Sequence, residues 1–269
     1  MGVRMELRSV VVFAAGMVLA TGAAVAETPQ SLIQRTVNSE RAANQTDLSN
    51  WLYREEVKKP KDGVVQWVAA TQYGSVRRVF ERGGQRVPEE KQRSAVQEFL
   101  RDTRAQKKAL AEDAHDAQQI DDFLKLLPVA FVWTEKSADA VNTTLHFEPD
   151  PKFHPPTREA KVFSGMVGDV VVDNQQLRVR SMDGRLVHEV TFGGGLLGRL
   201  KEGSSFALEQ SQTGPSLWQL TALHVHLVGN ALLFKSVSLE EDDERTNFEL
   251  EQENETVEQA GELVLRQVE

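Results

Sequence analysis

The sequence predicts an α+β protein built on a strongly curved antiparallel sheet of about ten strands, an open half-barrel with a helical lid and a helix near each end. Short apolar runs, separated by turn dipeptides at regular intervals, fill most of residues 51–239 of the 269-residue chain. One long segment with helical spacing interrupts them, and shorter helical patterns stand at both ends of the region. A sheet with so many antiparallel strands curls because each strand twists.

The first elements follow from apolar spacing and turn residues. Apolar residues recur at helical intervals over residues 28–44 and predict an amphipathic helix there. Alternating runs come next, and Asp62-Gly63 and Gly74-Ser75 separate them, as is typical of hairpin turns. The chain therefore predicts three consecutive antiparallel strands, at residues 51–53, 64–68 and 76–80.

Residues 88–127 predict a helical segment that lies over the sheet and touches it mainly at its two ends. Apolar residues keep helical spacing near both ends, whereas residues 101–108 are polar on nearly all sides. A polar middle is typical of a solvated helix or of a break between two shorter helices. Pro128 is expected to end the segment.

A second group of strands fills the rest of the chain, after a strand pair at residues 129–135 and 141–148 and a proline-rich loop at 148–156. Asp183-Gly184 is interpreted as one of its turns. Strict alternation after residue 217 puts Leu223 on one face and Trp218 on the other. The strands of this meander are expected at residues 169–173, 177–182, 186–192, 206–210, 217–228 and 231–239.

The C-terminal segment, residues 240–269, is acidic. Residues 240–262 hold eleven acidic residues and one basic residue, Arg245. Phe248 and Leu250 predict a last edge strand, and residues 256–266 a final helix. The common role of such a run is a solvated surface; the alternative is a docking site for a basic partner.

Composition excludes several classes of function. The chain has no cysteine, which excludes disulfides, thiolate metal sites, a cysteine nucleophile and lipidation of a leading cysteine. Its formal net charge of −9 argues against nucleic acid and against adsorption on anionic lipid. We expect no cofactor and no catalytic residues, because H-E-x-x-H, G-x-S-x-G and P-loop patterns are absent from the sequence.

Residues 1–26 read as a secretory signal peptide. Arg4 and Arg8 precede an apolar run at residues 10–20, and Ala24-Val25-Ala26 fits the A-x-A form that signal peptidase cuts. The run is shorter than the ~20 residues of a membrane span, and no later stretch reaches that length. We therefore expect cleavage after Ala26 and a periplasmic or secreted, unlipidated protein without a transmembrane segment, whose residues 27–269 form one domain.

Three weaker patterns have structural alternatives. Gly193, Gly195 and Gly198 match G-x-G-x-x-G, but no βαβ unit follows, so a turn that presents Leu196 and Leu197 is favoured over nucleotide binding. His224 and His226 share a strand face and offer two metal ligands, but no third ligand is predictable. His146 and His154 are likewise without support as ligands, and packed or surface histidines are the favoured interpretation. The acids Asp169, Asp173 and Asp183 are more simply turn and surface residues than a hydrolytic pair.

One stretch carries a family resemblance. Phe163-Ser164-Gly165-Met166-Val167-Gly168-Asp169-Val170-Val171-Val172-Asp173, followed by Leu177-Arg178-Val179 and Asp183-Gly184, resembles the strand-turn-strand repeat of outer-membrane lipoprotein-sorting proteins, the lipoprotein carriers. The resemblance covers about residues 29–250. It implies a half-closed barrel capped by helices, whose apolar cavity holds lipid or the acyl chains of a lipoprotein. The helical segment 88–127 is longer than that family leads us to expect.

These patterns lead to two functional hypotheses. The first is a non-catalytic exported protein that sequesters a lipid or lipoprotein acyl chain in an apolar cavity of the cell envelope. The second is an envelope scaffold with a filled core that binds a protein partner through its acidic end or an open sheet edge. The residues expected to line the cavity are Trp67, Phe80, Trp133, Phe147, Leu196, Leu197, Trp218 and Phe234. Ordinary core packing is the alternative for each of them.

Overall fold

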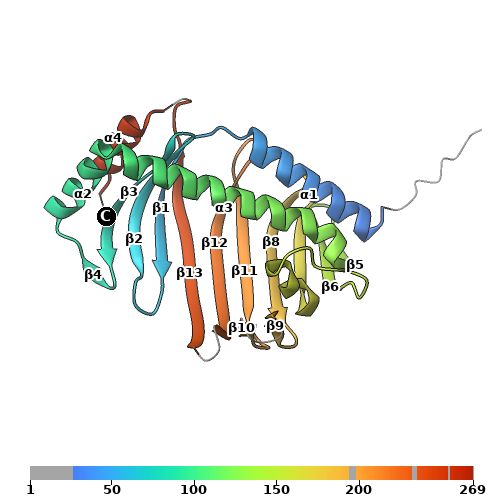
Figure 1. Ribbon diagram of the computed structural model, residues 1–269. Coiled ribbons are helices and arrows are strands. Elements are labelled where there is room, and N and C mark those ends of the chain that lie inside the picture. The colour runs from blue at the N-terminus through green and yellow to red at the C-terminus, as the bar shows by residue number, and fades with distance from the viewer. Residues whose placement is uncertain (1–26, 194–197, 232–234, 254, 269) are drawn as a thin grey trace, which may run out of the picture.

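A single open antiparallel sheet of 13 strands forms the centre of the molecule in the computed structural model, which describes residues 27–193, 198–231, 235–253 and 255–268. The main path is β4-β3-β2-β1-β13-β12-β11-β8-β7-β6-β5, and β9 and β10 pair beside it (Figure 1). With helices near both ends of the described chain, this arrangement confirms the predicted α+β class, with more strands than expected. No helix in the described part of the chain is long and apolar enough to cross a bilayer.

The strands follow the predicted hairpins closely at the start of the chain and are longer than predicted at its end. The strands are β1 (Trp51–Lys58), β2 (Val64–Thr71), β3 (Gly74–Arg82), β4 (Gln85–Arg86), β5 (Phe131–Ala138), β6 (Asn142–Pro149), β7 (Met166–Asp173), β8 (Arg178–Leu186), β9 (Val190–Phe192), β10 (Gly198–Leu200), β11 (Ser205–Gly214), β12 (Leu217–Ala231) and β13 (Lys235–Leu250). The helices are α1 (Pro29–Thr46), α2 (Glu89–Arg101), α3 (Thr103–Ala130), the short 3₁₀ helix η1 (Glu159–Gly165) and α4 (Val257–Arg266).

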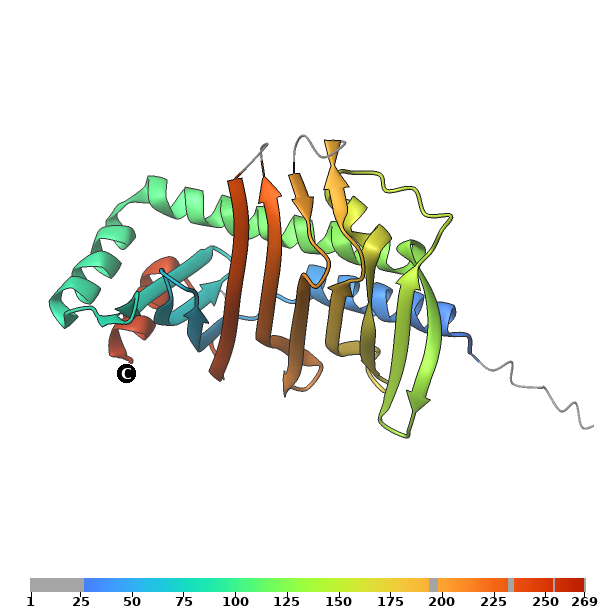
Figure 2. The ribbon, with the colours of Figure 1, turned by 90° about the horizontal axis from the view of Figure 1, so that it is seen from below.

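Helices cover both faces of the sheet, but over different strands. We call one side the α3 face, because Ser75 of β3 donates a hydrogen bond there to Asp113 of α3 at 3.1 Å. α1 and η1 pack on that face as well. α2 and α4 pack on Val76 and Phe80, which alternate with Ser75 along β3 and therefore lie on its opposite face. Figure 1 shows α3 crossing the strands, and Figure 2 shows the same crossing from below.

The predicted helical segment is two helices. Asp102 separates them: its backbone leaves helical geometry, and its carboxylate accepts hydrogen bonds from the amides of Arg104 and Ala105 as the N-cap of α3. The break falls in the polar stretch where the sequence allowed one. The expectation that Pro128 ends the helix is wrong, because α3 continues to Ala130 with Pro128 in its last turn.

Two apolar cores flank the sheet, one on each face, and a third apolar cluster between them contains strand residues only: Trp51, Tyr53 and Val68, with Leu217 and Phe248 packed against them. The larger lies on the α3 face, where Ile33 of α1 and Leu127 of α3 pack with Leu145, Phe147 and other residues of β5–β8. The smaller lies on the opposite face, between α2 and α4 and strands β1–β3, around Leu52, Trp67 and Val96. The sheet therefore has two well-packed ends.

Three further expectations about the strands are corrected. Phe248 and Leu250 belong to β13, which pairs with β1 and β12 at the centre of the sheet, not at an edge. Asp183-Gly184 lies inside β8 and not in a turn. Glu209 of β11 pairs with Ala222 of β12, and the next residue, Gln210, pairs with Leu220. Thr221 is therefore an extra residue in β12, and this register shift reverses the alternation of the residues before it. That shift brings Trp218 to the α3 face with Leu223, contrary to strict alternation.

Candidate functional site

Helix α3 is fixed to the rest of the molecule at its two ends. Its first half packs on β3, and its last turns pack on α1, η1 and β5. At the far end Arg41 of α1 donates to Asp121 at 2.6 Å, and Lys125 lies 2.7 Å from the same carboxylate. The hydrogen bond from Arg41, followed by that from Lys125, lowers the pKa of Asp121 to about 2. The helix thus spans the sheet between two anchors, as the sequence predicted.

The middle of α3 is not packed against the sheet beneath it. Every residue from 114 to 120 is exposed. Asp113 and Leu124 face the sheet, because Asp113 accepts a hydrogen bond from Ser75 and Leu124 packs on the larger core. At 100° per residue, Ala117 and Ile120 lie on the same side of the helix as these two residues. Ile120 nevertheless keeps 53% of its surface exposed. We call residues 114–120 the α3 span.

The strands on the same face carry an apolar surface, which we call the floor. It consists of Phe206, Leu208, Leu223, Val225 and Leu227, each only half-buried. The register aligns Leu223 with Leu208 and Met182, and Val225 with Phe206 and Gly184, so the floor continues the larger core sideways. The core is fully buried under the end of α3 and becomes half-exposed on β11 and β12.

A buried charge cluster borders the floor on β13 and β1. Asp243 lies opposite Leu223, and its carboxylate accepts from Arg245 at 2.7 Å. Arg245 also lies 3.2 Å from Glu55, and both carboxylates are more than nine-tenths buried. Tyr53 lies beneath the Arg245 guanidinium, and burial raises the pKa of its hydroxyl. This cluster borders the floor on the side of β1, next to the apolar cluster that contains Tyr53.

A cavity of about 780 Å³ opens at the other end of β12. We call it the strand-end cavity: the chain between α1 and β1, the turn before β12 and the end of β13 line it, together with Trp218 and Arg178. Arg178 forms a buried ion pair with Glu40 of α1 at 2.9 Å. Asn50, 1% exposed, also lines the cavity, and its side-chain oxygen has no hydrogen-bond partner.

The predicted cavity residues separate into distinct places. Trp67 and Phe80 lie in the smaller core, and Trp133 and Phe147 in the larger core. Trp218 alone among the described members of the set lines the strand-end cavity, where its indole nitrogen donates to Gln176 at 2.8 Å. Leu196, Leu197 and Phe234 fall outside the described residues. Their role in ligand binding stays a prediction.

His146, His224 and His226 lie on the strand face away from α3, whereas His154 lies in the loop after β6. His224 and His226 share that face as predicted, and His224 contacts Asp242 at 2.8 Å. His146 pairs with Asp169 at 2.7 Å. Burial and the nearby Asp169 raise the pKa of Asp183. Among the described residues no three His, Asp or Glu side chains are placed to hold a metal ion.

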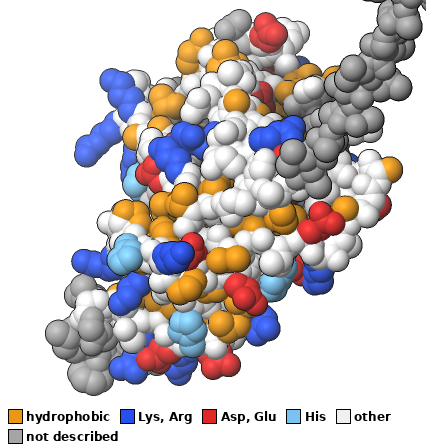
Figure 3. Space-filling view, turned by 90° about the vertical axis from the view of Figure 1, so that its right-hand side faces the viewer, with side chains coloured by type: hydrophobic (Ala, Val, Ile, Leu, Met, Phe, Trp, Pro, Cys, Tyr) orange, Lys and Arg blue, Asp and Glu red, His pale blue; other side chains and the backbone are white. Residues whose placement is uncertain are grey.

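Residues of the site that the sequence did not single out include Arg178, Glu40 and Asn50. Their signal is weak, because a buried charge pair between residues 138 positions apart leaves no local pattern. The open β5 edge shows no single type of surface: hydrophobic, charged and histidine side chains are interspersed where Figure 3 views that end of the molecule. No family model, no curated protein and no solved structure matches the chain.

Proposed function

We propose that the protein is an exported, non-catalytic binding protein that sequesters an apolar chain, of a lipid or of a lipoprotein, between the α3 span and the floor. One observation carries the proposal: Ala117 and Ile120 face the sheet from a helix anchored at both ends, yet they remain exposed above half-buried apolar strands. Apolar surface on two facing elements gains free energy when a third apolar body fills the space.

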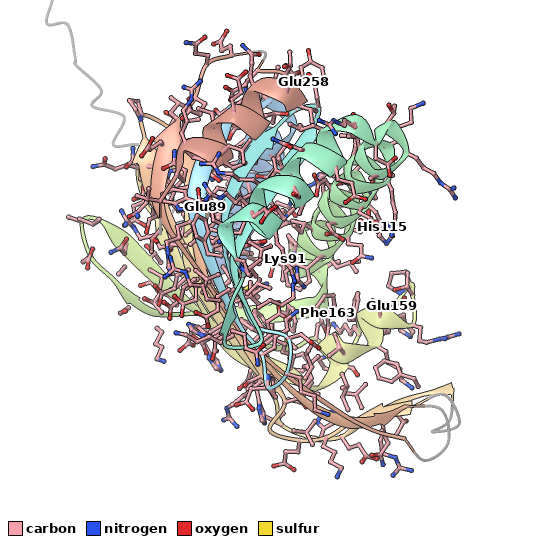
Figure 4. The ribbon with its side chains drawn as sticks, turned by 90° about the vertical axis from the view of Figure 1, so that its left-hand side faces the viewer. Glu89, Lys91, His115, Glu159, Phe163 and Glu258 are labelled. Atoms are coloured by element: carbon pink, nitrogen blue, oxygen red, sulfur yellow. The ribbon has the colours of Figure 1, made fainter. Side chains whose placement is uncertain are left out.

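The arrangement also supports reversible binding. The cores at both ends are dense, so the sheet keeps its shape while the middle stays open. The ring of Phe163 of η1, labelled in Figure 4, lies 5.3 Å from the ring of Phe123 of α3 and 5.4 Å from that of Phe131, measured between ring centroids. These aromatic rings close the far end of the space between α3 and the sheet. A ligand would therefore lie along β11 and β12 and not penetrate the larger core.

Substitution of one floor residue tests this proposal. Val225→Lys places a charge on the floor, whereas His226→Lys places the same charge on the opposite face of the same strand. We expect the first variant to weaken binding of the neutral fluorescent probe N-phenyl-1-naphthylamine by about tenfold, since a buried apolar side chain contributes about 1.5–3 kcal/mol. We expect the second to bind like the unmodified protein.

The measurement is a fluorescence titration of each purified protein, with circular dichroism to verify folding. Equal loss of binding in both variants, or an unmodified protein that does not bind the probe, would overturn the proposal. The latter result favours the envelope scaffold, whose apolar surfaces would serve a protein partner.

A further inference from the structure

The strand-end cavity and the floor lie on one continuous face of β12. Because of the register shift, Trp218 and Leu220 share the α3 face with Leu223 and Val225. Trp218 and Val225 pair with Gln212 and Phe206 of β11, which are six residues apart. At about 3.3 Å per residue, the two side chains therefore lie about 20 Å apart along the strand. An extended amphiphile with its chain on the floor can therefore reach the cavity with its head group.

The cavity has unbalanced negative charge. Asp47, Glu251 and Glu253 line it, and the one cation in its described lining is Arg178. Arg178 is neutralised by Glu40, with both side chains more than nine-tenths buried. Burial and the neighbouring Glu249 raise the pKa of Glu251, and the opposing effect of Arg266, which lies outside the cavity lining, is smaller.

Asn50 supplies an independent indication of a ligand. Its amide nitrogen donates to the backbone carbonyl of Gln252 at 2.5 Å, which fixes the orientation of the amide. Its oxygen is buried without a donor, and such an acceptor costs about 1–3 kcal/mol when it stays unpaired. Arg178 has the complementary feature, a buried Nε with no acceptor. A ligand that brings an N–H donor to Asn50 and an oxygen acceptor to Arg178 would satisfy both groups.

We propose that the strand-end cavity binds the primary ammonium head of an amphiphile, a head of the phosphoethanolamine type, whose acyl chain lies on the floor. The ammonium lies among Asp47, Glu251 and Glu253 and donates to Asn50, and a phosphate oxygen accepts from Arg178. Exposed Leu48 and Leu250, 65% and 57% accessible, border the cavity where the head joins the chain. This inference rests on the proposed function and adds the class of head group.

Three lysophospholipids with the same acyl chain test the head group below their micelle concentration. Lysophosphatidylethanolamine has N–H donors, lysophosphatidylcholine has a methylated ammonium without them, and lysophosphatidylglycerol has no ammonium. We expect calorimetric affinity to fall in that order, with about tenfold between the first two, because hydrogen bonds to charged groups contribute that much. Glycerophosphoethanolamine, which lacks the chain, is expected to bind at least a hundredfold more weakly.

Glu251→Gln/Glu253→Gln should reduce the preference for the ethanolamine head to less than about threefold and leave the binding of the neutral naphthylamine probe unchanged. Glu98→Gln/Glu202→Gln changes net charge equally at two exposed acids outside the cavity and should keep the preference. Equal affinity for the ethanolamine and choline lipids, or tight binding of glycerophosphoethanolamine, would overturn the head-group inference while the proposed function stands. If neither the lysolipids nor the neutral probe bound to the protein, that result would instead contradict the proposed function.

Discussion

Replacing Arg178 by methionine is expected to destabilise the protein by about 3–5 kcal/mol, because it leaves the carboxylate of Glu40 buried without a cation. Glu40 is 2% exposed and Arg178 6% exposed, and Glu40 also accepts from the backbone amide of Val179 at 2.6 Å. The pair joins α1 to β8 at the border of the strand-end cavity. Urea unfolding of the variant and the unmodified protein measures the difference.

Two further variants show whether the cause is the unpaired charge. Glu40→Met/Arg178→Met should recover much of the loss, because apolar residues of similar size replace a buried pair at little cost. Arg93→Met removes one partner of the exposed pair with Glu89, and should cost less than about 1 kcal/mol. If Arg178→Met were as mild as Arg93→Met, the buried pair would not hold α1 on the sheet.

Alanine at Gly168 is expected to cost about 3 kcal/mol or more, because a Cβ there cannot be accommodated by moving a side chain alone. A Cβ would lie 1.9 Å from the backbone oxygen of Asp183 and 2.7 Å from the ring of Phe147. Gly168 lies opposite Gly184, which in turn lies beside Phe206, so this pair of glycines makes room for aromatic rings on both sides.

Gly214→Ala is the matched control for this substitution. The nearest atom to a Cβ there is Cδ1 of the flexible Leu217 side chain at 3.3 Å, so a small cost, below about 1 kcal/mol, is expected. Thermal unfolding of the two variants gives the comparison. Equal stability of the two would show that β7 and β8 do not approach as closely as described.

The sequence was a good guide wherever local pattern decides structure. Alternation and the Asp62-Gly63 turn located β1 and β2, and the polar stretch at residues 101–108 located the break between α2 and α3. The predicted turn at Gly74-Ser75 is wrong, because both residues belong to β3 and the turn lies at Gln72 and Tyr73. The polar stretch also predicted contact with the sheet mainly at the two ends of the segment, but it put the unpacked middle at residues 101–108, whereas the exposed part of α3 over the sheet is residues 114–120. Both signals act within a few residues of the structure that they determine.

Where long-range pairing decides, the sequence was a poor guide. The acidic residues 240–250 do not resemble a central strand, yet β13 pairs with β1 and β12 because Arg245 neutralises buried Asp243 and Glu55. Asp183-Gly184 has the composition of a turn but serves close packing within β8. The register shift that moves Trp218 to the α3 face depends on the partner strand, so strict alternation could not reveal it.

The candidate site was less predictable than the fold. Aromatic residues on strands are equally suited to core and to cavity, and four of the predicted set lie in the two cores. What distinguishes the floor is partial burial beneath a helix whose residues 114–120 stay exposed, and that property arises from α3 being anchored at Asp113 and Asp121. The strand-end cavity likewise depends on segments brought together from five parts of the chain.

Photochemical cross-linking with a palmitic acid that carries a diazirine near its methyl end tests the central claim most directly. We expect labelled peptides to come from the α3 span, residues 114–120, and from β11 and β12 around Leu208 and Val225. Competition by unlabelled palmitate should remove the label. Labelling confined to the face that carries His224 and His226, or label that unlabelled palmitate does not displace, would contradict the account.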